Sequence, residues 1–376
     1  MAVAAAAADV VAAADVAAAV VAVVAETDMI CENTNRLLMQ FHITGRCNLR
    51  CKHCYRTEGN VEPLTTEQVL AVIDGFAALQ KRYNTLHGLR KRGHINITGG
   101  EPFVRADIDR ILDHLGSYRQ QFSFGVLSNG SFLDENRMAS LKKNGVAFVQ
   151  LSIDGDPATH DSLRAPGDYD RTFAVARRLE KHGIRTYISF TANRGNYTCL
   201  PQVAKQCRKY GITKLWSDRI VPIGNAEQLQ ELAITKEILP DYLKVLKKAR
   251  GNWLTRWLYP KTQVTTNRAL QFLGTQGSIY ACSAGKSLIT VDEFGRIMPC
   301  RRMPILCGDI HTETLEAVYF ENEVFKALRG NDIPKGCSSC AYSYYCRGGA
   351  KCQAYAAGGS FCRPDPACFL QRTVSK

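Results

Sequence analysis

Three cysteines, Cys47, Cys51 and Cys54, lie within one short stretch of the chain and constrain it more than any other feature. They follow residues 37–43, an apolar run of strand length, so we expect the thiols in a loop that ends a buried strand. Three thiols so close together cannot all pair as disulfides, and thiolates at this density suit zinc or an iron–sulfur cluster. Structural zinc usually takes four protein ligands, whereas three thiols would hold a cubane with one iron left open.

The cysteine content is compatible with two classes of protein. Fifteen cysteines in 376 residues could form a secreted disulfide framework or serve as ligands in an intracellular metal protein. Secretion requires a signal peptide, but residues 2–8 contain no Lys or Arg, and Asp9 and Asp15 interrupt the apolar run. The sequence also has no uninterrupted run of about 18 apolar residues that would predict a membrane span. We therefore expect a cytoplasmic protein with no membrane partner.

The net charge narrows the choice of partners. There are 48 Lys and Arg against 35 Asp and Glu, which gives +13 at neutral pH. Nucleic acid, anionic lipid and acidic peptides are all attracted to a basic surface. The basic residues are scattered, however, and no basic stripe alternates with aromatic side chains that could stack on bases. The composition therefore indicates a solvated basic surface or an acidic peptide partner, and no nucleic acid partner.

Residues 1–25 consist almost entirely of Ala, Val and Asp. An amphipathic surface helix would also use Leu, Lys and Glu, so this restricted alphabet is not typical of one. We interpret residues 1–36 as a low-complexity or linker segment and exclude it from functional reasoning. It could stand where a small leader-binding module would be, but 25 residues are too few for a complete one.

The next two hundred residues alternate between two patterns. Strand-length apolar runs and helical patterns follow one another at 37–44, 66–83, 94–98, 105–115, 122–128, 135–144, 147–153, 169–182, 185–192, 200–210 and 214–222. Such alternation predicts parallel strands joined by right-handed helical crossovers. We therefore predict an α/β fold with a partial (β/α)6 TIM-like barrel over residues 37–235.

The last third of the chain has a different character. Residues 236–281 are predicted to form a mostly helical connection. From Cys282 the cysteines become dense, so we predict a small cysteine-rich domain over residues 282–376, with short β-hairpins and helices. Its elements are expected as strands at 288–291 and 297–299, a turn at 293–295 and one helix at 314–328.

The cysteine loop resembles that of the radical SAM superfamily. In this family a Cys-x3-Cys-x2-Cys loop holds a [4Fe–4S] cluster whose open iron is chelated by the amino and carboxylate groups of S-adenosylmethionine. The match includes His53 before the third cysteine and Tyr55 after it, and both are implied to lie beside the cofactor. A structural metal knuckle is the alternative that the spacing alone leaves open.

The segment Gly99-Gly100-Glu101-Pro102 follows the second predicted strand, where the chemistry of parallel barrels collects. Two glycines let the backbone approach a ligand closely, and Glu101 offers an acceptor for an ammonium group. In the radical SAM family the corresponding segment grips the methionyl amino group of the cofactor. Without the preceding cysteine loop, these four residues could equally be a tight turn.

Polar side chains after the later strands resemble further family positions. The resemblance implies that cofactor or substrate contacts come from Ser128, Asn129, Ser152, Asp154, Arg164 and Asn193. Among these, Asp154 is the predicted catalytic residue, Arg164 would bind the methionyl carboxylate by a bidentate contact, and Asn193 would line the adenosine pocket. The alternative is that Asp154 and Asn129 simply form turns with the glycines that follow them.

The C-terminal cysteines resemble the SPASM extension of radical SAM enzymes, which carries two auxiliary [4Fe–4S] clusters. The similarity implies four ligands for the outer cluster, Cys337, Cys340, Cys346 and Cys368. Cys282 and Cys300 would ligate the inner cluster. The family pattern has a further cysteine at the position of Ala350 in this chain, so the remaining inner ligands are open.

Cys307 and Cys352 are the candidates for these remaining positions. The inner cluster could instead keep an open iron for the substrate. A zinc ribbon built on Cys337 and Cys340 is the structural alternative for this region.

The resemblance implies the reaction as well. The cluster would pass an electron to the sulfonium of S-adenosylmethionine and so release a 5′-deoxyadenosyl radical that abstracts hydrogen from an unactivated carbon. We therefore predict an enzyme that modifies a residue of a precursor peptide, forming a thioether or carbon–carbon cross-link or another modification. The expected partners are a precursor peptide with an acidic leader and an external electron donor of the flavodoxin or ferredoxin type.

Two other functions are compatible with parts of the sequence. A sulfatase-maturating enzyme, which oxidises Cys or Ser to formylglycine, would need a catalytic Asp near the inner cluster, and Asp292 is the candidate. A non-catalytic iron–sulfur electron carrier belongs to a different class. It would not need the cofactor grip of residues 99–102.

Overall fold

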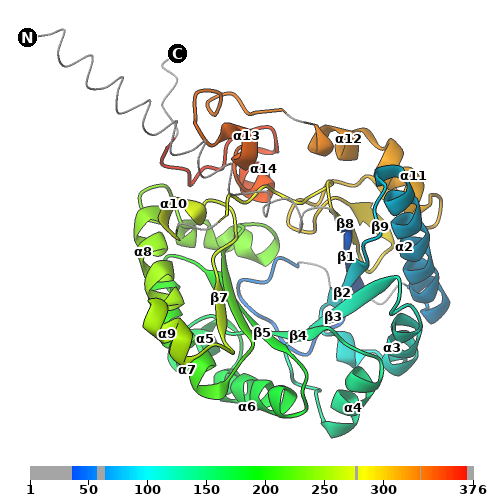
Figure 1. The fold of residues 1–376 in the computed structure, drawn as a ribbon, viewed down its shortest axis with the longest axis horizontal. Coiled ribbons are helices and arrows are strands. Elements are labelled where there is room, and N and C mark those ends of the chain that lie inside the picture. Colours follow the sequence, from blue (N-terminus) through cyan, green and yellow to red (C-terminus); the bar gives the residue numbers. More distant parts are fainter. Residues whose placement is uncertain (1–35, 57–63, 276–277, 331, 371–376) are drawn as a thin grey trace, which may run out of the picture. The chain divides into compact units, whose positions relative to one another are not determined.

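The computed structural model describes residues 36–56, 64–275, 278–330 and 332–370 (Figure 1). Residues 1–35 of the predicted N-terminal segment therefore lie outside the described residues. From Leu37 onward the described chain forms one compact unit. The predicted boundaries at 235 and 282 stay predictions, because the barrel and the cysteine-rich region belong to this same unit.

One sheet of ten strands organises the described chain. Seven strands lie side by side in sequence order and in parallel: β1 (Leu38–Thr44), β2 (Gly93–Gly99), β3 (Phe122–Leu127), β4 (Phe148–Ser152), β5 (Thr186–Ala192), β6 (Lys214–Arg219) and β7 (Gln263–Thr265). The predicted α/β partial barrel is confirmed. The three-residue strand β7 was missed, because so short a run carries no period-two pattern.

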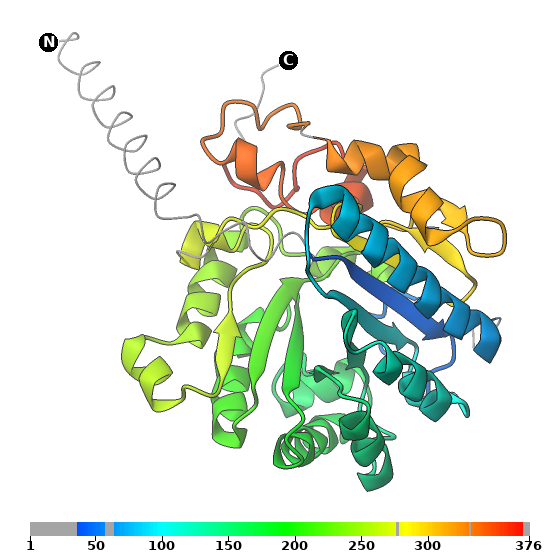
Figure 2. The ribbon, with the colours of Figure 1, turned by 45° about the vertical axis from the view of Figure 1, so that its right-hand side comes forward.

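Helices connect these strands and cover the outer face of the sheet, as the two views show (Figures 1 and 2). They are α2 (Thr66–His87), α3 (Ile108–Ser117), α4 (Glu135–Lys143), α5 (Pro157–Leu163), α6 (Asp168–Lys181), α7 (Leu200–Tyr210), α8 (Leu239–Arg250) and α9 (Trp253–Leu258). The short helix α5 was not predicted. It begins with Pro157 and is capped by Asp156, whose Oδ1 accepts from Thr159 N at 2.8 Å. No helix in the described residues is long and apolar enough to cross a membrane.

The barrel strands alternate between two environments. On β4, Val149 and Leu151 are fully buried against the helices, while Gln150 and Ser152 point into a cavity on the inner side. On β6, Leu215 is likewise buried and Trp216 lines the cavity. Side chains alternate across a strand, so this period of two separates an apolar outer layer from a polar interior. The interior is thereby left available for a site.

The cysteine-rich region continues the barrel sheet. Strand β8 (Leu288–Val291) pairs in parallel with β1, and β9 (Arg296–Met298) and β10 (Gly308–Asp309) extend the sheet in antiparallel fashion. Gly295 turns the chain between β8 and β9 at φ +85°, a conformation that favours glycine. The predicted hairpin is therefore confirmed, and its pairing with β1 fixes the following cysteines beside the first barrel loop.

The predicted single helix at 314–328 is wrong, because the chain forms α11 (Leu315–Glu321) and α12 (Glu323–Arg329). Asn322 separates them in an extended conformation. Its Oδ1 caps the second helix by accepting from Val324 N at 2.9 Å, and its Nδ2 donates to Cys307 O at 2.8 Å. Asparagine side chains compete with helical backbone bonds in this way. The remaining short helices are α10 (Phe272–Thr275), α13 (Ser343–Cys346) and α14 (Lys351–Gly358).

A buried ion pair attaches the last described loop to the barrel. Arg219, at the end of β6, donates to Asp365, with Nη1 and Oδ1 2.9 Å apart, and both side chains are buried. Asp365 also accepts from the backbone N–H groups of Ala350 and Ala367 at 3.1 Å each. Removing either partner would leave a buried charge uncompensated, which typically costs about 3–5 kcal/mol. The loop therefore holds the start of α14 against β6.

Candidate functional site

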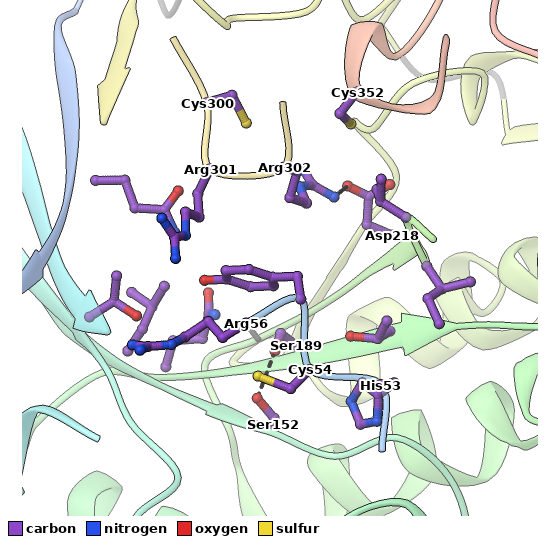
Figure 3. Close-up of a pocket in the computed structure, with 18 of the residues that line it drawn as sticks. His53, Cys54, Arg56, Ser152, Ser189, Asp218, Cys300, Arg301, Arg302 and Cys352 are labelled. Atoms are coloured by element: carbon purple, nitrogen blue, oxygen red, sulfur yellow. Dashed lines mark hydrogen bonds and ion pairs between the residues drawn. The ribbon is translucent and has the colours of Figure 1, made fainter. Parts of the chain in front are cut away.

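A cavity of about 520 Å³ lies at the carboxyl ends of the parallel strands. The barrel loops form one side of it, and the cysteine-rich region forms the other. Figure 3 shows both sides, with Cys54 and His53 from the first barrel loop and with Cys300 and Cys352 from the C-terminal region. Concave sites of this kind are where ligands bind in such folds.

Cys47, Cys51 and Cys54 all line this cavity, as the sequence predicts for a shared ligand set. Burial raises the pKa of Cys51 to about 11, although the Arg164 guanidinium 3.8 Å from its Sγ opposes the shift. Thiols with raised pKa values become ligands when a bound metal displaces their protons. The described residues contain no group of three Cys, His, Asp or Glu side chains that could hold a single metal ion.

The Cys47 thiol already receives two N–H donors. Leu49 N lies 3.4 Å and Asn129 Nδ2 lies 3.9 Å from its Sγ. Hydrogen bonds to sulfur are one means by which proteins set the reduction potential of an iron–sulfur cluster. The loop therefore fits a thiolate-bound cluster by its donor set and by its surroundings.

Gly99 and Gly100 bring the second strand end directly against the cysteine loop. Gly100 N donates to Thr44 O at 2.9 Å, and Glu101 N donates to Arg46 O at 2.8 Å. A Cβ atom would lie 2.2 Å from Thr44 O at position 99 and 2.1 Å from Arg46 O at position 100. Only glycine permits this approach, and the backbone of both residues faces the cavity. The predicted proximity of the two motifs is confirmed.

Glu101 and Pro102 lie behind the cavity wall. The Glu101 carboxylate is fully buried and accepts from Ser128 Oγ at 2.8 Å, Asn129 N at 2.7 Å and Phe103 N at 3.2 Å. Pro102 is buried at the start of a 3₁₀ turn over Pro102–Val104. The side chain of Glu101 thus orients Ser128 and Asn129, which line the cavity together with the backbone of Gly99 and Gly100.

Asp154 lies outside the cavity lining, and its catalytic role stays a prediction. It is fully buried and accepts from Arg164 Nε at 2.7 Å, Thr191 N at 2.7 Å and His53 Nε2 at 3.2 Å. Burial would raise its pKa, but Arg164 and His53 hold the pKa well below its usual range. A carboxylate that binds protons this weakly is a poor general base. Asp154 instead orients Arg164 and His53.

Arg164 is predicted to bind a carboxylate of the cofactor with both arms of its guanidinium, but in the structure it binds Asp154. Two of its nitrogens bind Asp154, with Nη2 2.6 Å from Oδ2, and its Nη1 faces the Cys51 thiol. Arg164 and His53 both line the cavity, so the guanidinium faces the cysteine loop. Its position suits stabilisation of a thiolate better than capture of a carboxylate by both arms of the fork.

The other predicted contacts divide into two groups. Ser152 lines the cavity and lies 3.2 Å from Ser189 Oγ, and Tyr55 lines it beside the backbone of Gly224. Asn193 lies outside the lining, because its Oδ1 accepts from Gly195 N at 2.8 Å within a turn. The expectation that Asn193 lines an adenosine pocket stays a prediction.

The cavity also contains the inner thiols. Cys282, Cys300 and Cys352 all line it, and the thiols of Cys300 and Cys282 both act to raise the pKa of Cys352. Burial raises the pKa of Cys352, whereas the neighbouring Arg302 lowers it. Cys352 thus reaches the inner group at the first turn of α14, although it is displaced along the chain from the family position.

Cys307 does not join this group. Its Sγ donates to Ile305 O at 3.4 Å, and its backbone N bonds Ile297 O at 2.9 Å across the β9–β10 pair. It packs with the barrel core, whereas Cys300 and Cys352 pack in a second hydrophobic cluster. The structure thus groups three of the candidate inner thiols around the cavity, and a ligand role for Cys307 stays a prediction.

The outer thiols form a separate group outside the cavity. Burial raises the pKa of Cys337, and the nearby thiols of Cys368 and Cys340 raise it further. Burial likewise raises the pKa of Cys346 to about 12, with contributions from Cys368 and Cys337. All four predicted outer ligands thus lie in one neighbourhood, as a shared cluster requires.

Sequence reasoning missed the charged residues that join the two sides of the cavity. Arg56, two positions after Cys54, pairs with Glu293 at 2.6 Å, and Arg301, directly after Cys300, lies 3.8 Å from the same Glu293 oxygen. Glu293 is fully buried. One carboxylate therefore bridges the two cysteine-bearing loops. The signal available in the sequence was an arginine within two positions after Cys54 and another directly after Cys300.

Two further acids near the inner thiols are occupied by arginines. Asp218 accepts from Arg302 Nη1 at 2.9 Å, as the dashed line in Figure 3 marks. Asp292 is fully buried and accepts from Arg296 Nε at 2.7 Å and Arg301 Nη1 at 3.1 Å. Asp292 lies outside the cavity lining, so it does not supply the catalytic carboxylate that a sulfatase-maturating enzyme would need.

Comparisons with known proteins agree with this geometry. The radical SAM superfamily model matches residues 41–210, and the SPASM iron–sulfur cluster-binding domain matches residues 282–341. The chain is a radical SAM enzyme with a SPASM domain. Its radical SAM domain binds a [4Fe–4S] cluster and S-adenosylmethionine, and its SPASM domain binds iron–sulfur clusters.

Two groups of characterised relatives resemble the chain at similar levels. An AdoMet-dependent heme synthase of Methanosarcina barkeri is 26% identical over 352 residues, which cover 89% of this chain and 96% of that protein. The mycofactocin maturase MftC of Mycolicibacterium smegmatis is 28% identical over 348 residues, which cover 88% and 82%. The sequences therefore give the family without selecting one substrate.

Solved structures share the fold. SuiB of Streptococcus suis bound to its precursor peptide SuiA has a TM-score of 0.68 at 15% identity, covering 90% of this chain and 76% of that one. The enzyme anSMEcpe with bound AdoMet and the Kp18Cys peptide has a TM-score of 0.67 at 17% identity, covering 89% and 94%.

Replacing Gly100 by Ala should displace the cysteine loop, because the new Cβ would meet the Arg46 carbonyl oxygen at 2.1 Å. We expect binding of S-adenosylmethionine to weaken by at least tenfold, on the order of 1.4 kcal/mol or more. Equilibrium dialysis of the cluster-loaded protein measures this. Gly75→Ala on α2 is the matched control, because its Cβ would have only ordinary contacts, at 3.7 Å from Leu315. Equal affinities of the Gly100→Ala and Gly75→Ala variants for S-adenosylmethionine would contradict the placement of Gly100 at the cofactor site.

The stability of the protein should depend on pH through Glu101. Burial raises its pKa to about 6, so the folded state binds this proton more tightly than the unfolded state does. Stability should therefore fall as the pH rises from 4 to 7, by about 2 kcal/mol relative to Glu101→Gln, and more than half of that loss should occur between pH 5 and pH 7. Melting temperatures measured at each pH test this, with Glu323→Gln on α12 as the control for loss of an exposed carboxylate. Parallel curves for wild type and Glu101→Gln would refute it.

Proposed function

We propose that this chain modifies a residue of a precursor peptide by radical chemistry in the cavity between its barrel and its SPASM domain. The supporting observation is that one cavity is lined both by the thiols of the first barrel loop and by the inner thiols. A peptide side chain entering from the open side would meet both groups. The resemblance to the maturase MftC and to the fold of peptide-bound SuiB supports the same substrate class.

The residues around the first barrel loop would hold the cluster and its cofactor. Cys47, Cys51 and Cys54 would be the ligands, and the backbone of Gly99 and Gly100 would accept from the ammonium group. When bound, this group supplies the abstraction of hydrogen from an unactivated carbon. The protein's own part is to orient the cofactor and the substrate and to exclude water. His53, Tyr55, Ser128, Asn129, Ser152 and Arg164 would form that enclosure.

The SPASM thiols would hold two auxiliary [4Fe–4S] clusters. Cys337, Cys340, Cys346 and Cys368 supply a complete set of four for the outer one. Cys282, Cys300 and Cys352 supply three for the inner one, so an inner iron would remain open toward the cavity. An external flavodoxin- or ferredoxin-like protein in the cytoplasm would provide the electron.

Arg268 would bind a carboxylate of the substrate. Its guanidinium lies over the Trp216 ring at 4.2 Å and lines the cavity. Among the described residues no carboxylate forms an ion pair with it, since the nearby Asp218 is occupied by Arg302. Such a cation, held by an aromatic face, can pair with an incoming anion. An acidic or C-terminal residue of the peptide would satisfy this requirement.

The heme synthase relatives support a second candidate substrate, a porphyrin. Porphyrin precursors of heme also carry carboxylates, and the cavity wall presents Arg56, Arg268, Arg301 and Arg302. The cavity chemistry therefore suits either substrate, and the reaction products distinguish them.

The experiment compares both substrates under reducing, anaerobic conditions. Reconstituted protein with S-adenosylmethionine should change the mass of a short Cys-, Trp- or Lys-containing peptide encoded beside its gene. Cys352→Ala should lose this product while it still cleaves the cofactor, because the first barrel loop is intact. Conversion of an iron porphyrin in place of the peptide would contradict the peptide assignment, and so would an undiminished yield from Cys352→Ala.

A further inference from the structure

A cluster of exposed apolar side chains covers the short helix α9, which projects from the barrel in Figure 2. The exposed fractions are 71% for Trp253, 72% for Trp257, 55% for Leu258, 45% for Tyr259 and 42% for Leu254. Five large apolar residues within one short segment are far more than the scattered exposure that is normal for a protein surface. We call these five residues the α9 patch.

The α9 patch lies away from the candidate active site. Helix α9 joins the end of α8 to the beginning of β7, and Gln263 N at that beginning bonds Thr213 O at 3.0 Å. The patch is therefore at the amino ends of the strands, whereas the cavity is at their carboxyl ends. None of its five residues lines the cavity. A peptide held at the patch would have to pass around the barrel to reach the cavity.

Exposed cations flank the patch. Lys247 and Lys248 lie in the last turn of α8, and Arg256 lies on α9 itself. Among the described residues these three form no ion pair with a carboxylate, whereas neighbouring Lys261 is paired with Glu180 at 3.2 Å. The surroundings of the patch are therefore positive, in keeping with the charge of +13 on the whole chain.

We propose that the α9 patch docks the protein reversibly on an anionic lipid bilayer. Trp and Tyr favour the interface between headgroups and acyl chains, and leucines beside them can insert into it. Lysine and arginine next to such a patch are attracted to anionic headgroups. A symmetric contact with a second copy would bring the same cations together. This contact needs no membrane span, and it leaves the cavity facing water.

Co-sedimentation of the cluster-loaded protein with vesicles tests the proposal. Binding to phosphatidylglycerol–phosphatidylcholine vesicles should exceed binding to pure phosphatidylcholine, and it should weaken with added salt. Trp253→Ser with Trp257→Ser should lower the partition by about tenfold or more. Lys247→Gln with Lys248→Gln should lower it on anionic vesicles only. Leu86→Ser with Leu306→Ser, at exposed leucines elsewhere, is the matched control and should bind as wild type does.

Tryptophan fluorescence gives a second readout. The emission of wild type should shift to the blue on anionic vesicles, and the double Trp variant, which retains only Trp216 inside the barrel, should show no shift. Wild type that stays in the supernatant with anionic vesicles would overturn the proposal. So would a dimer in sedimentation velocity that dissociates in the double Trp variant, because a second copy would then be the occupant.

Discussion

The contact between the glycine pair after β2 and the cysteine loop after β1 is the constraint on which the site depends. Gly100 has no room for a Cβ beneath the Arg46 carbonyl, and two backbone hydrogen bonds hold the strands' ends together. Because the two strands are parallel neighbours, the loop of thiols and the backbone that would hold the cofactor's ammonium group share one edge of the sheet. The auxiliary thiols complete the enclosure only because β8 pairs with β1 on the other side.

Ion pairs between acidic residues and arginines give the cavity a positively charged lining. Asp154, Asp218 and Glu293 are each paired with arginines that line the cavity. Asp154 and Glu293 lie behind the wall, whereas Asp218 lines the cavity together with its partner Arg302. Burying such ions is costly unless the pairing is good, and a pair that loses one member is strongly destabilised. The arrangement presents a positive surface to thiolates, to cluster sulfide and to an anionic substrate. It also couples the first barrel loop to the inner thiols through Glu293.

The sequence was sufficient for the features that depend on local pattern. The spacing of Cys47, Cys51 and Cys54, the glycine pair and the alternation of strands and helices identified the barrel and its active edge. It was not sufficient where the partner lies far along the chain. The role of Asp154 depends on Arg164 and on the Thr191 N–H, and the bridge at Glu293 depends on a pairing between β8 and β1. Cys352 reaches the inner group because Asp365 accepts a hydrogen bond from Ala350 N and so fixes the start of α14. The spacing of the cysteines in the sequence does not predict this contact.

The central claim is that three thiolates in the first barrel loop leave one iron for S-adenosylmethionine, and cofactor cleavage tests it most directly. Dithionite-reduced, cluster-loaded protein should release 5′-deoxyadenosine from S-adenosylmethionine, and Cys51→Ala should release none. A loop that holds zinc with four protein ligands, or wild-type protein that contains its cluster and releases no 5′-deoxyadenosine, would contradict the account.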